Sequence, residues 1–151
     1  MILSSLHILS SSILGIFLGA QLTEAVLFVP YWKNMTADEF FQFYQRHGQY
    51  IHRFFAPLTI AATVLPILTA LYHVMYPSDD QWLSFVLAGS SIAFFSTFFL
   101  YFKKANQGFT DRSIPDEALP AELSNWGHWH WGRIFFEVIA FGSALSLLLM
   151  D

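Results

Sequence analysis

The feature that most constrains this chain is a series of four long apolar segments separated by short polar stretches. They predict helices at about residues 3–31, 37–76, 81–105 and 121–150. Each contains close to the ~20 apolar residues that cross the hydrocarbon core of a bilayer. A backbone in lipid satisfies its hydrogen bonds only in helices or closed barrels. With three short connections, we expect one membrane domain over residues 1–151, an all-α up-down four-helix bundle.

Composition supports a membrane protein and argues against several classes of function. Hydrophobic residues make up 55% of the 151 residues and charged residues 12%, against about 25% charged in soluble domains. The net charge of −4 argues against nucleic-acid binding. The absence of cysteine excludes disulfides, thiolate catalysis and cysteine-based metal sites. The expected partner is the lipid bilayer, and a homo-oligomer or another membrane partner stays open.

The distribution of lysine and arginine predicts an orientation. The turn between the second and third segments holds Asp79 and Asp80 and no basic residue. The other two connections hold the basic residues, which are Lys33, Arg46, Arg53, Lys103, Lys104 and Arg112. Because basic loops stay on the cytoplasmic side, both long connections should be cytoplasmic and both termini non-cytoplasmic.

Each segment carries one polar stripe at helical spacing, and each stripe is richest toward the predicted cytoplasmic end. The stripe of the first segment continues from Glu24 through Phe28 to Tyr31. The stripe of the third segment reaches Lys104. Polar faces turn inward in lipid, so we predict a polar pocket near the cytoplasmic leaflet. Its predicted lining is Gln21, Glu24, Gln49, His52, Thr59, Thr97, Tyr101, His130, Arg133 and Glu137. Interhelical packing would also explain the threonines.

The stretch NWGHWHWGRIFFE, residues 125–137, opens the fourth segment. On a helix, Trp126, His130, Arg133 and Glu137 share one face. Charged residues inside a membrane indicate a functional site. The alternative is that Arg133 simply pairs with Glu137 and that the tryptophans anchor the helix at the membrane interface. Glu24 lies in an apolar segment and needs a partner. We therefore expect it to contact His130 or Arg133.

Three chemistries fit such a pocket. Glu24, His52, His130 and Glu137 could hold a first-row transition metal, although the Glu-x-x-His spacing of di-iron bundles is missing. His52 and His130 could bind haem b as axial ligands. Without a cofactor, a histidine tuned by a carboxylate could act as general base on an acidic, lipophilic substrate. The cofactor stays open, and the predicted catalytic residues are His130, Arg133, Glu24 and His52.

Three short stretches resemble the anthrone-oxygenase-like family of small four-helix membrane proteins. The run EAVLFVPYW ends the first segment, YFKKANQGF places Asn106 in the third loop, and W-x-x-W-H-x-x-R covers residues 126–133. The resemblance implies oxygenation of an electron-rich polycyclic phenol by some members, without a known metal. This loop reads N-Q-G-F from Asn106 in place of the commoner Asn-x-Pro-x-Asn. The predicted substrate contacts are Gln21, Gln49, Tyr101, Asn106, Trp126 and Trp129.

Two classes of function remain open. The first is a membrane oxidoreductase, oxygenase-like, acting on a hydrophobic and by resemblance aromatic small molecule. The second is a non-enzymatic haem- or metal-binding membrane subunit or a small carrier. A carrier should have polar residues through its full depth, but residues 138–150 contain only Ser143 and Ser146. We therefore expect a one-ended pocket, and interpret His7, His47 and His73 as interfacial or incidental.

Overall fold

The structure is a computed structural model that describes residues 1–150, and this part of the chain is all-helical. The elements are α1 (Ile2–Thr23), η1 (Glu24–Phe28), α2 (Val29–Lys33), α3 (Ala37–Met75), α4 (Gln81–Thr97), η2 (Phe98–Phe102), α5 (Lys103–Thr110), η3 (Asp116–Ala118) and α6 (Leu119–Met150). They form four continuous segments within the described residues, each long and apolar enough to cross a membrane. This confirms the predicted all-α membrane fold.

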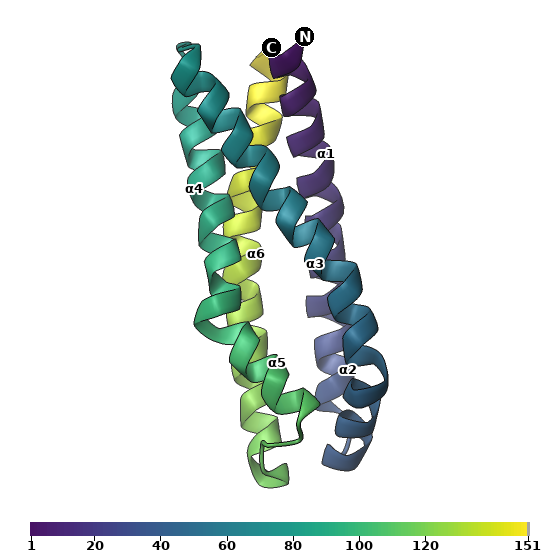
Figure 1. Cartoon of the computed structure of the whole chain (residues 1–151). Helices are drawn as coiled ribbons and strands as arrows, with labels where there is room; N and C mark the ends of the chain where they lie inside the picture. The colour runs from purple at the N-terminus through teal and green to yellow at the C-terminus, as the bar shows by residue number, and fades with distance from the viewer. Residues whose placement is uncertain (151) are drawn as a thin grey trace.

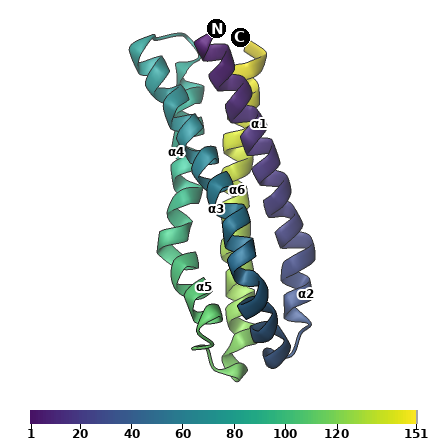
Figure 2. The same ribbon diagram turned by 45° about the vertical axis from the view of Figure 1, so that its right-hand side comes forward.

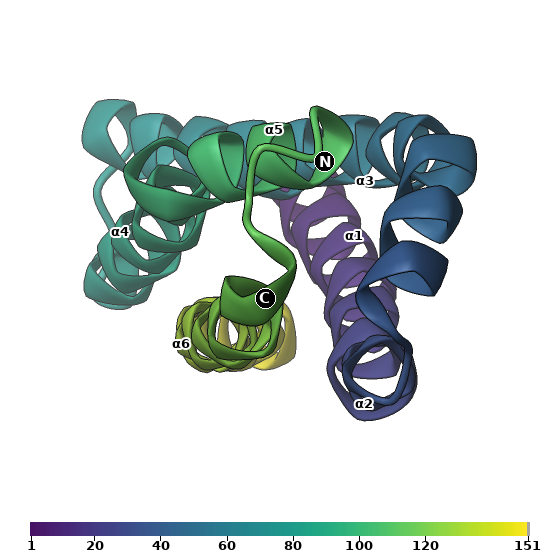
Figure 3. The same cartoon turned by 90° about the horizontal axis from the view of Figure 1, so that it is seen from below.

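The four segments form an elongated bundle (Figures 1 and 2). Both termini lie at one end together with the turn between α3 and α4, which we call the terminal end. The opposite loop end holds the α2–α3 connection, α5 and η3. α6 packs against α1 and α4, and α3 packs against the same two helices. Seen along the bundle from the loop end, α3 runs across the space between α4 and α1 (Figure 3).

The start of α3 is fixed by a cap at Thr36. The backbone N–H of Glu39 donates to the Thr36 hydroxyl, and the Glu39 carboxylate accepts from the backbone N–H of Thr36. This reciprocal pair satisfies two backbone donors that have no partner within the helix. Pro57 and Pro66 lie inside α3 without ending it.

Two π-helical turns interrupt the first and third segments. In η1 the N–H of Val29 donates to the carbonyl of Glu24, and in η2 the N–H of Lys103 donates to that of Phe98. Each bond spans five residues instead of four. A π turn therefore rotates the following helix by about 100° relative to an unbroken α-helix. This change of phase decides which side chains reach the interior at the loop end.

The interior has an aromatic cluster at the loop end and an aliphatic cluster nearer the terminal end. The aromatic cluster is built from Trp32, Phe40, Phe41, Phe102, Phe109 and Trp126, with smaller apolar neighbours. Arg112 closes this end, since its guanidinium donates to Asp38 and lies 5.1 Å from the ring centre of Phe41. The aliphatic cluster includes Leu14, Leu87, Ala140 and Leu147. Between α3 and η2, a cavity opens beside the aromatic cluster.

Candidate functional site

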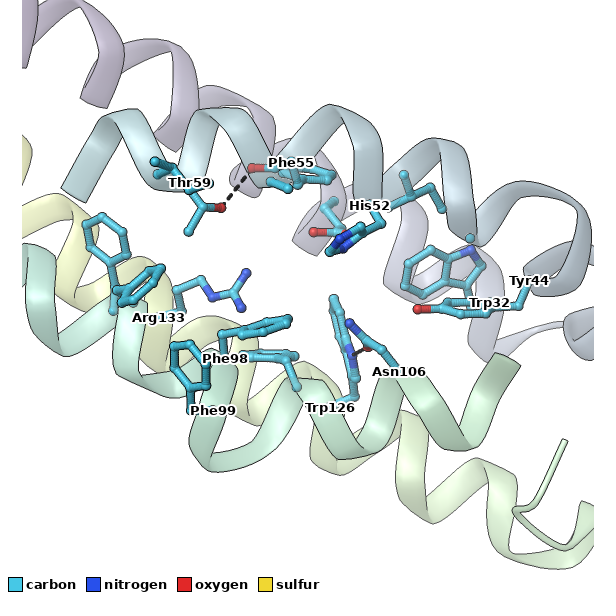
Figure 4. A pocket seen from close by; sticks show the side chains of 18 residues that line it. Trp32, Tyr44, His52, Phe55, Thr59, Phe98, Phe99, Asn106, Trp126 and Arg133 are labelled. Atoms are coloured by element: carbon cyan, nitrogen blue, oxygen red, sulfur yellow. Dashed lines mark hydrogen bonds between the residues drawn. The ribbon is translucent and has the colours of Figure 1, made fainter. Parts of the chain in front are cut away.

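A cavity of about 320 Å³ lies between α3 on one side and α4, η2 and α5 on the other (Figure 4). This volume falls in the range of small-molecule sites. Its apolar lining is Trp32, Tyr44, Ile51, Phe55, Ala56, Ile60, Phe94, Phe95, Phe98, Phe99, Phe102 and Trp126. Its polar lining is Glu24, His52, Thr59, Asn106, Arg133 and the hydroxyl of Tyr44. The lining is therefore suited to a flat, apolar molecule with few polar atoms.

The carboxylate in the wall, Glu24, comes from the first residue of the π turn η1. It is buried, and its Oε2 lies 3.9 Å from Nε2 of His130. The expected contact between Glu24 and His130 is thus present. His130 Nε2 also lies 2.9 Å from the backbone oxygen of Gln21. A carbonyl oxygen can only accept, so Nε2 carries a proton and donates, and a neutral His130 would have its lone pair on Nδ1.

The cation in the wall, Arg133, lies one helical turn beyond His130 on α6. Its side chain is only 9% exposed, and its guanidinium carbon lies 4.0 Å from the ring centre of Phe102. Its Nε donates to the hydroxyl of Thr97 at 3.3 Å. Among residues 1–150, no carboxylate oxygen lies within 4.0 Å of the guanidinium. Figure 4 shows the guanidinium pointing into the cavity, where its terminal N–H groups are available to a ligand.

The remaining buried polar groups of this region lie behind the cavity wall. Gln21, His130 and Glu137 are completely buried and do not line the cavity. The Gln21 amide, both oxygens of Glu137 and Nδ1 of His130 have no hydrogen-bond partner within residues 1–150. Glu24 and Glu137 both act electrostatically on Arg133. The cation and the two carboxylates therefore form one charge cluster, and the direct pair of Arg133 with Glu137, which was the alternative interpretation, is not present among residues 1–150.

Two predicted lining residues, Gln49 and Tyr101, and one predicted substrate contact, Trp129, lie elsewhere. Gln49 is exposed on the outside of α3. Tyr101 stacks on Trp129 with ring centres 5.1 Å apart and donates from its hydroxyl to Glu122. Neither ring of this pair lines the cavity, so Gln49, Tyr101 and Trp129 are not cavity residues.

The π turns explain why the wrong side chain was predicted to face inward at the end of the third segment, and also at the end of the first. At the end of η2, Phe102 is buried at the cavity in place of the predicted Tyr101. Beyond η1, Trp32 is buried in place of the predicted Tyr31. Both inward positions are shifted by one residue, as one extra residue in a helical turn requires. In α3, Tyr44 faces inward and Gln49 faces outward. Burying the Tyr44 ring is favourable, whereas burying an unpaired glutamine amide costs free energy.

The four residues predicted as metal ligands do not converge. Among residues 1–150, no group of three or more His, Asp or Glu side chains is placed to hold a metal ion. Glu24 and His130 are neighbours, His52 lies on the α3 wall, and Glu137 lies behind the cavity. The predicted haem pair is not brought together either. Only His52 of that pair lines the cavity, while the His130 ring is stacked on Trp126 at 4.9 Å.

Comparison of the chain with protein-family models, with curated proteins and with solved structures finds no match. The resemblance to the anthrone-oxygenase-like family therefore remains a prediction from three short stretches.

A second buried polar region, at the terminal end, was not predicted from the sequence. His7 and His73 are completely buried and stack with ring centres 5.8 Å apart. The Ser78 hydroxyl shares a hydrogen bond with His73 Nδ1 and donates to Asp80, which lowers the pKa of that carboxyl. The interpretation of His7 and His73 as interfacial was wrong. Leu14 and Phe17 separate this region from the cavity along α1.

The two histidines of the loop-end half of α3 differ in position, as expected. His52 lines the cavity, whereas the His47 ring lies against Phe43 at 4.8 Å and borders a groove on the outer surface. We predict that His52→Ala weakens binding of 2-naphthol by about three- to tenfold, because the imidazole ring is part of the surface that the probe covers. His47→Ala should leave binding unchanged. Equal effects in a titration of tryptophan fluorescence would contradict this assignment.

Proposed function

We propose that this integral membrane protein binds a hydrophobic, aromatic molecule carrying an acidic oxygen and activates it by removing a proton. One observation carries the proposal. The aromatic cavity is lined by both a buried carboxylate, Glu24, and a buried guanidinium, Arg133, and the two act on each other electrostatically. A base beside a fixed cation is the arrangement that stabilises an oxyanion as it forms.

In this proposal, a phenol or enol O–H of the substrate donates to the Glu24 carboxylate. The negative charge that develops on the oxygen is stabilised by the terminal N–H groups of Arg133. His130 lies behind Glu24, with its Nε2–H donated to the Gln21 carbonyl at 2.9 Å and its Nε2 3.9 Å from the carboxylate. The low dielectric of the bundle strengthens both interactions.

The resemblance to anthrone-oxygenase-like proteins suggests a reaction with dioxygen after the proton is removed. An electron-rich phenolate or enolate can react with dioxygen at carbon. For a substrate with a CH₂ group next to the aromatic rings, the overall change is R₂CH₂ + O₂ → R₂C=O + H₂O. One oxygen atom enters the new carbonyl group and the other leaves as water. The protein would thus be an oxygenase-like oxidoreductase.

We propose that the substrate enters sideways from the bilayer. The cavity lies between α3 and η2, and two of its lining side chains are also largely on the outer surface, Phe99 at 60% and Ile60 at 56% exposure. Lipid-soluble molecules concentrate in the hydrocarbon core, so a lateral opening would supply the site without a water-filled channel.

Binding of 2-naphthol to the protein in lipid vesicles tests the proposed function. This probe carries one acidic O–H on a flat apolar body, and Trp32 and Trp126 of the lining should report its arrival as a loss of tryptophan emission. We expect saturable quenching. The control, 2-methylnaphthalene, lacks the O–H and should bind about tenfold more weakly, because the charge-assisted hydrogen bonds are missing. Equal, non-saturable quenching by both compounds would count against the proposal.

We further propose that the loop end, and with it the cavity, faces the cytoplasm, because the lysines and arginines of the two long connections lie there. Single cysteines at Asp79 and Ser113, both exposed and at opposite ends of the bundle, should react with a membrane-impermeant maleimide from opposite sides. In intact cells only the Asp79 variant should be labelled. Labelling of Ser113→Cys alone would reverse the orientation.

A further inference from the structure

Asn106 presents a hydrogen-bond donor of fixed orientation to the same cavity. The indole Nε1 of Trp126 lies 2.9 Å from Oδ1 of Asn106 (Figure 4). An indole N–H can only donate, so the atom that it meets must be the amide oxygen, and the amide nitrogen is on the other side. That nitrogen has no hydrogen-bond partner within residues 1–150. Trp126 thus positions the Asn106 NH₂ group as a donor.

The spacing of this donor from Arg133 follows from α6, which holds both Arg133 and Trp126, the residue bonded to Asn106. Trp126, the residue bonded to Asn106, is seven residues before Arg133 on α6, which is about 10 Å along the helix axis at 1.5 Å per residue. Both Asn106 and Arg133 line the cavity, with aromatic rings between them. A flat molecule of two or three fused rings spans such a distance.

We infer that the ligand carries a second oxygen acceptor, a carbonyl or equivalent, at the end of its aromatic body remote from the acidic O–H, and that Asn106 recognises it. This rests on the proposed function, because the acidic O–H is placed at Glu24 and Arg133. Asn106 would then be the residue that distinguishes a carbonyl-bearing aromatic acid from a simple phenol. A donor that a bound ligand covers but does not pair is costly, so a ligand lacking the acceptor binds less tightly.

Two probes that differ by one acetyl group test the inference. 6-Acetyl-2-naphthol carries a carbonyl group remote from its O–H, and 2-naphthol does not. We expect the wild-type protein in vesicles to bind the acetyl compound about fivefold more tightly, as one added hydrogen bond implies. In Asn106→Asp, which keeps an acceptor for Trp126 but has no N–H₂ donor, and in Asn106→Leu, this preference should disappear. The readout is the ratio of the two affinities within each protein, so a change in the lining that affects both probes alike does not alter it.

The outcomes separate the inference from the proposed function. If 2-naphthol binds saturably but the wild type shows no preference for the acetyl compound, or if both Asn106 variants keep the preference, the inference is overturned. If the affinities for both probes fall by the same factor in both variants while the variants remain folded, Asn106 does not distinguish the probes and the inference is also overturned. If neither probe binds the wild-type protein saturably, the proposed function fails as well.

Discussion

Replacing Glu24 by Gln is expected to lower proton transfer from bound 2-naphthol by roughly a hundredfold, the lower end of what a positioned base supplies. Photoexcited naphthol is a strong acid and emits at longer wavelength once it has lost its proton. In an apolar cavity it can do so rapidly only if a base is within hydrogen-bonding distance. The wild-type protein should show the naphtholate band. Glu24→Gln should show emission from neutral naphthol, with its binding reduced less than about threefold.

The matched control for this experiment is Glu122→Gln. Glu122 accepts from the Tyr101 hydroxyl outside the cavity, so its replacement should leave the naphtholate band unchanged. A naphtholate band that survives Glu24→Gln and disappears with His52→Leu would transfer the role of base to His52. A variant that no longer folds would lose binding of both 2-naphthol and 2-methylnaphthalene, which the binding titration detects separately.

Replacing Arg133 by Met is expected to destabilise the bundle by about 3–5 kcal/mol, because buried charge loses its compensating partner. Glu24 and Glu137 both act on this guanidinium, and both are buried. Without the cation, two carboxylates remain in a medium of low dielectric. Either they take up protons or the bundle opens to expose them to water. The free energy of unfolding, measured by titrating the detergent-solubilised protein with dodecyl sulfate, should report the loss.

Two further variants separate charge from packing at this position. Arg133→Lys keeps the charge but loses the planar contact with the Phe102 ring, which lies 4.0 Å from the guanidinium carbon. Its stability should lie between wild type and Arg133→Met. The double variant Arg133→Met with Glu137→Gln removes one of the excess carboxylates and should recover about half of the lost stability. No recovery in the double variant would show that the loss comes from packing alone.

Much of the fold was predictable because membrane helices can be recognised from length and hydropathy. The four spans and the contact between Glu24 and His130 agree with the structure. The 3–4 spacing of residues 130, 133 and 137 on α6 was also correct, since these side chains share one buried face of an unbroken helix. Here the sequence determines which residues meet without reference to the neighbouring helices.

The cavity lining was only partly predictable because a helix can change phase without a sequence signal. The π turns at η1 and η2 shift the inward face by one residue, so Trp32 and Phe102 replace Tyr31 and Tyr101. Polarity was also a poor guide where aromatic rings compete for the interior, which placed Gln49 outside the bundle and Tyr44 inside. The buried stack of His7 on His73 joins residues from two helices, and no pattern within one segment indicates such a pair.

Binding of an aromatic acid inside the bundle is tested most directly by photolabelling with an azide-bearing naphthol added to vesicles that contain the protein. The labelled residues can be identified by mass spectrometry of peptides. We expect labelling of cavity residues on both walls, at 51–60 of α3 and 94–102 of α4 and η2, and protection of both by excess 2-naphthol. Labelling confined to lipid-facing positions such as Phe135 and Leu149, unaffected by 2-naphthol, would contradict the proposed binding site.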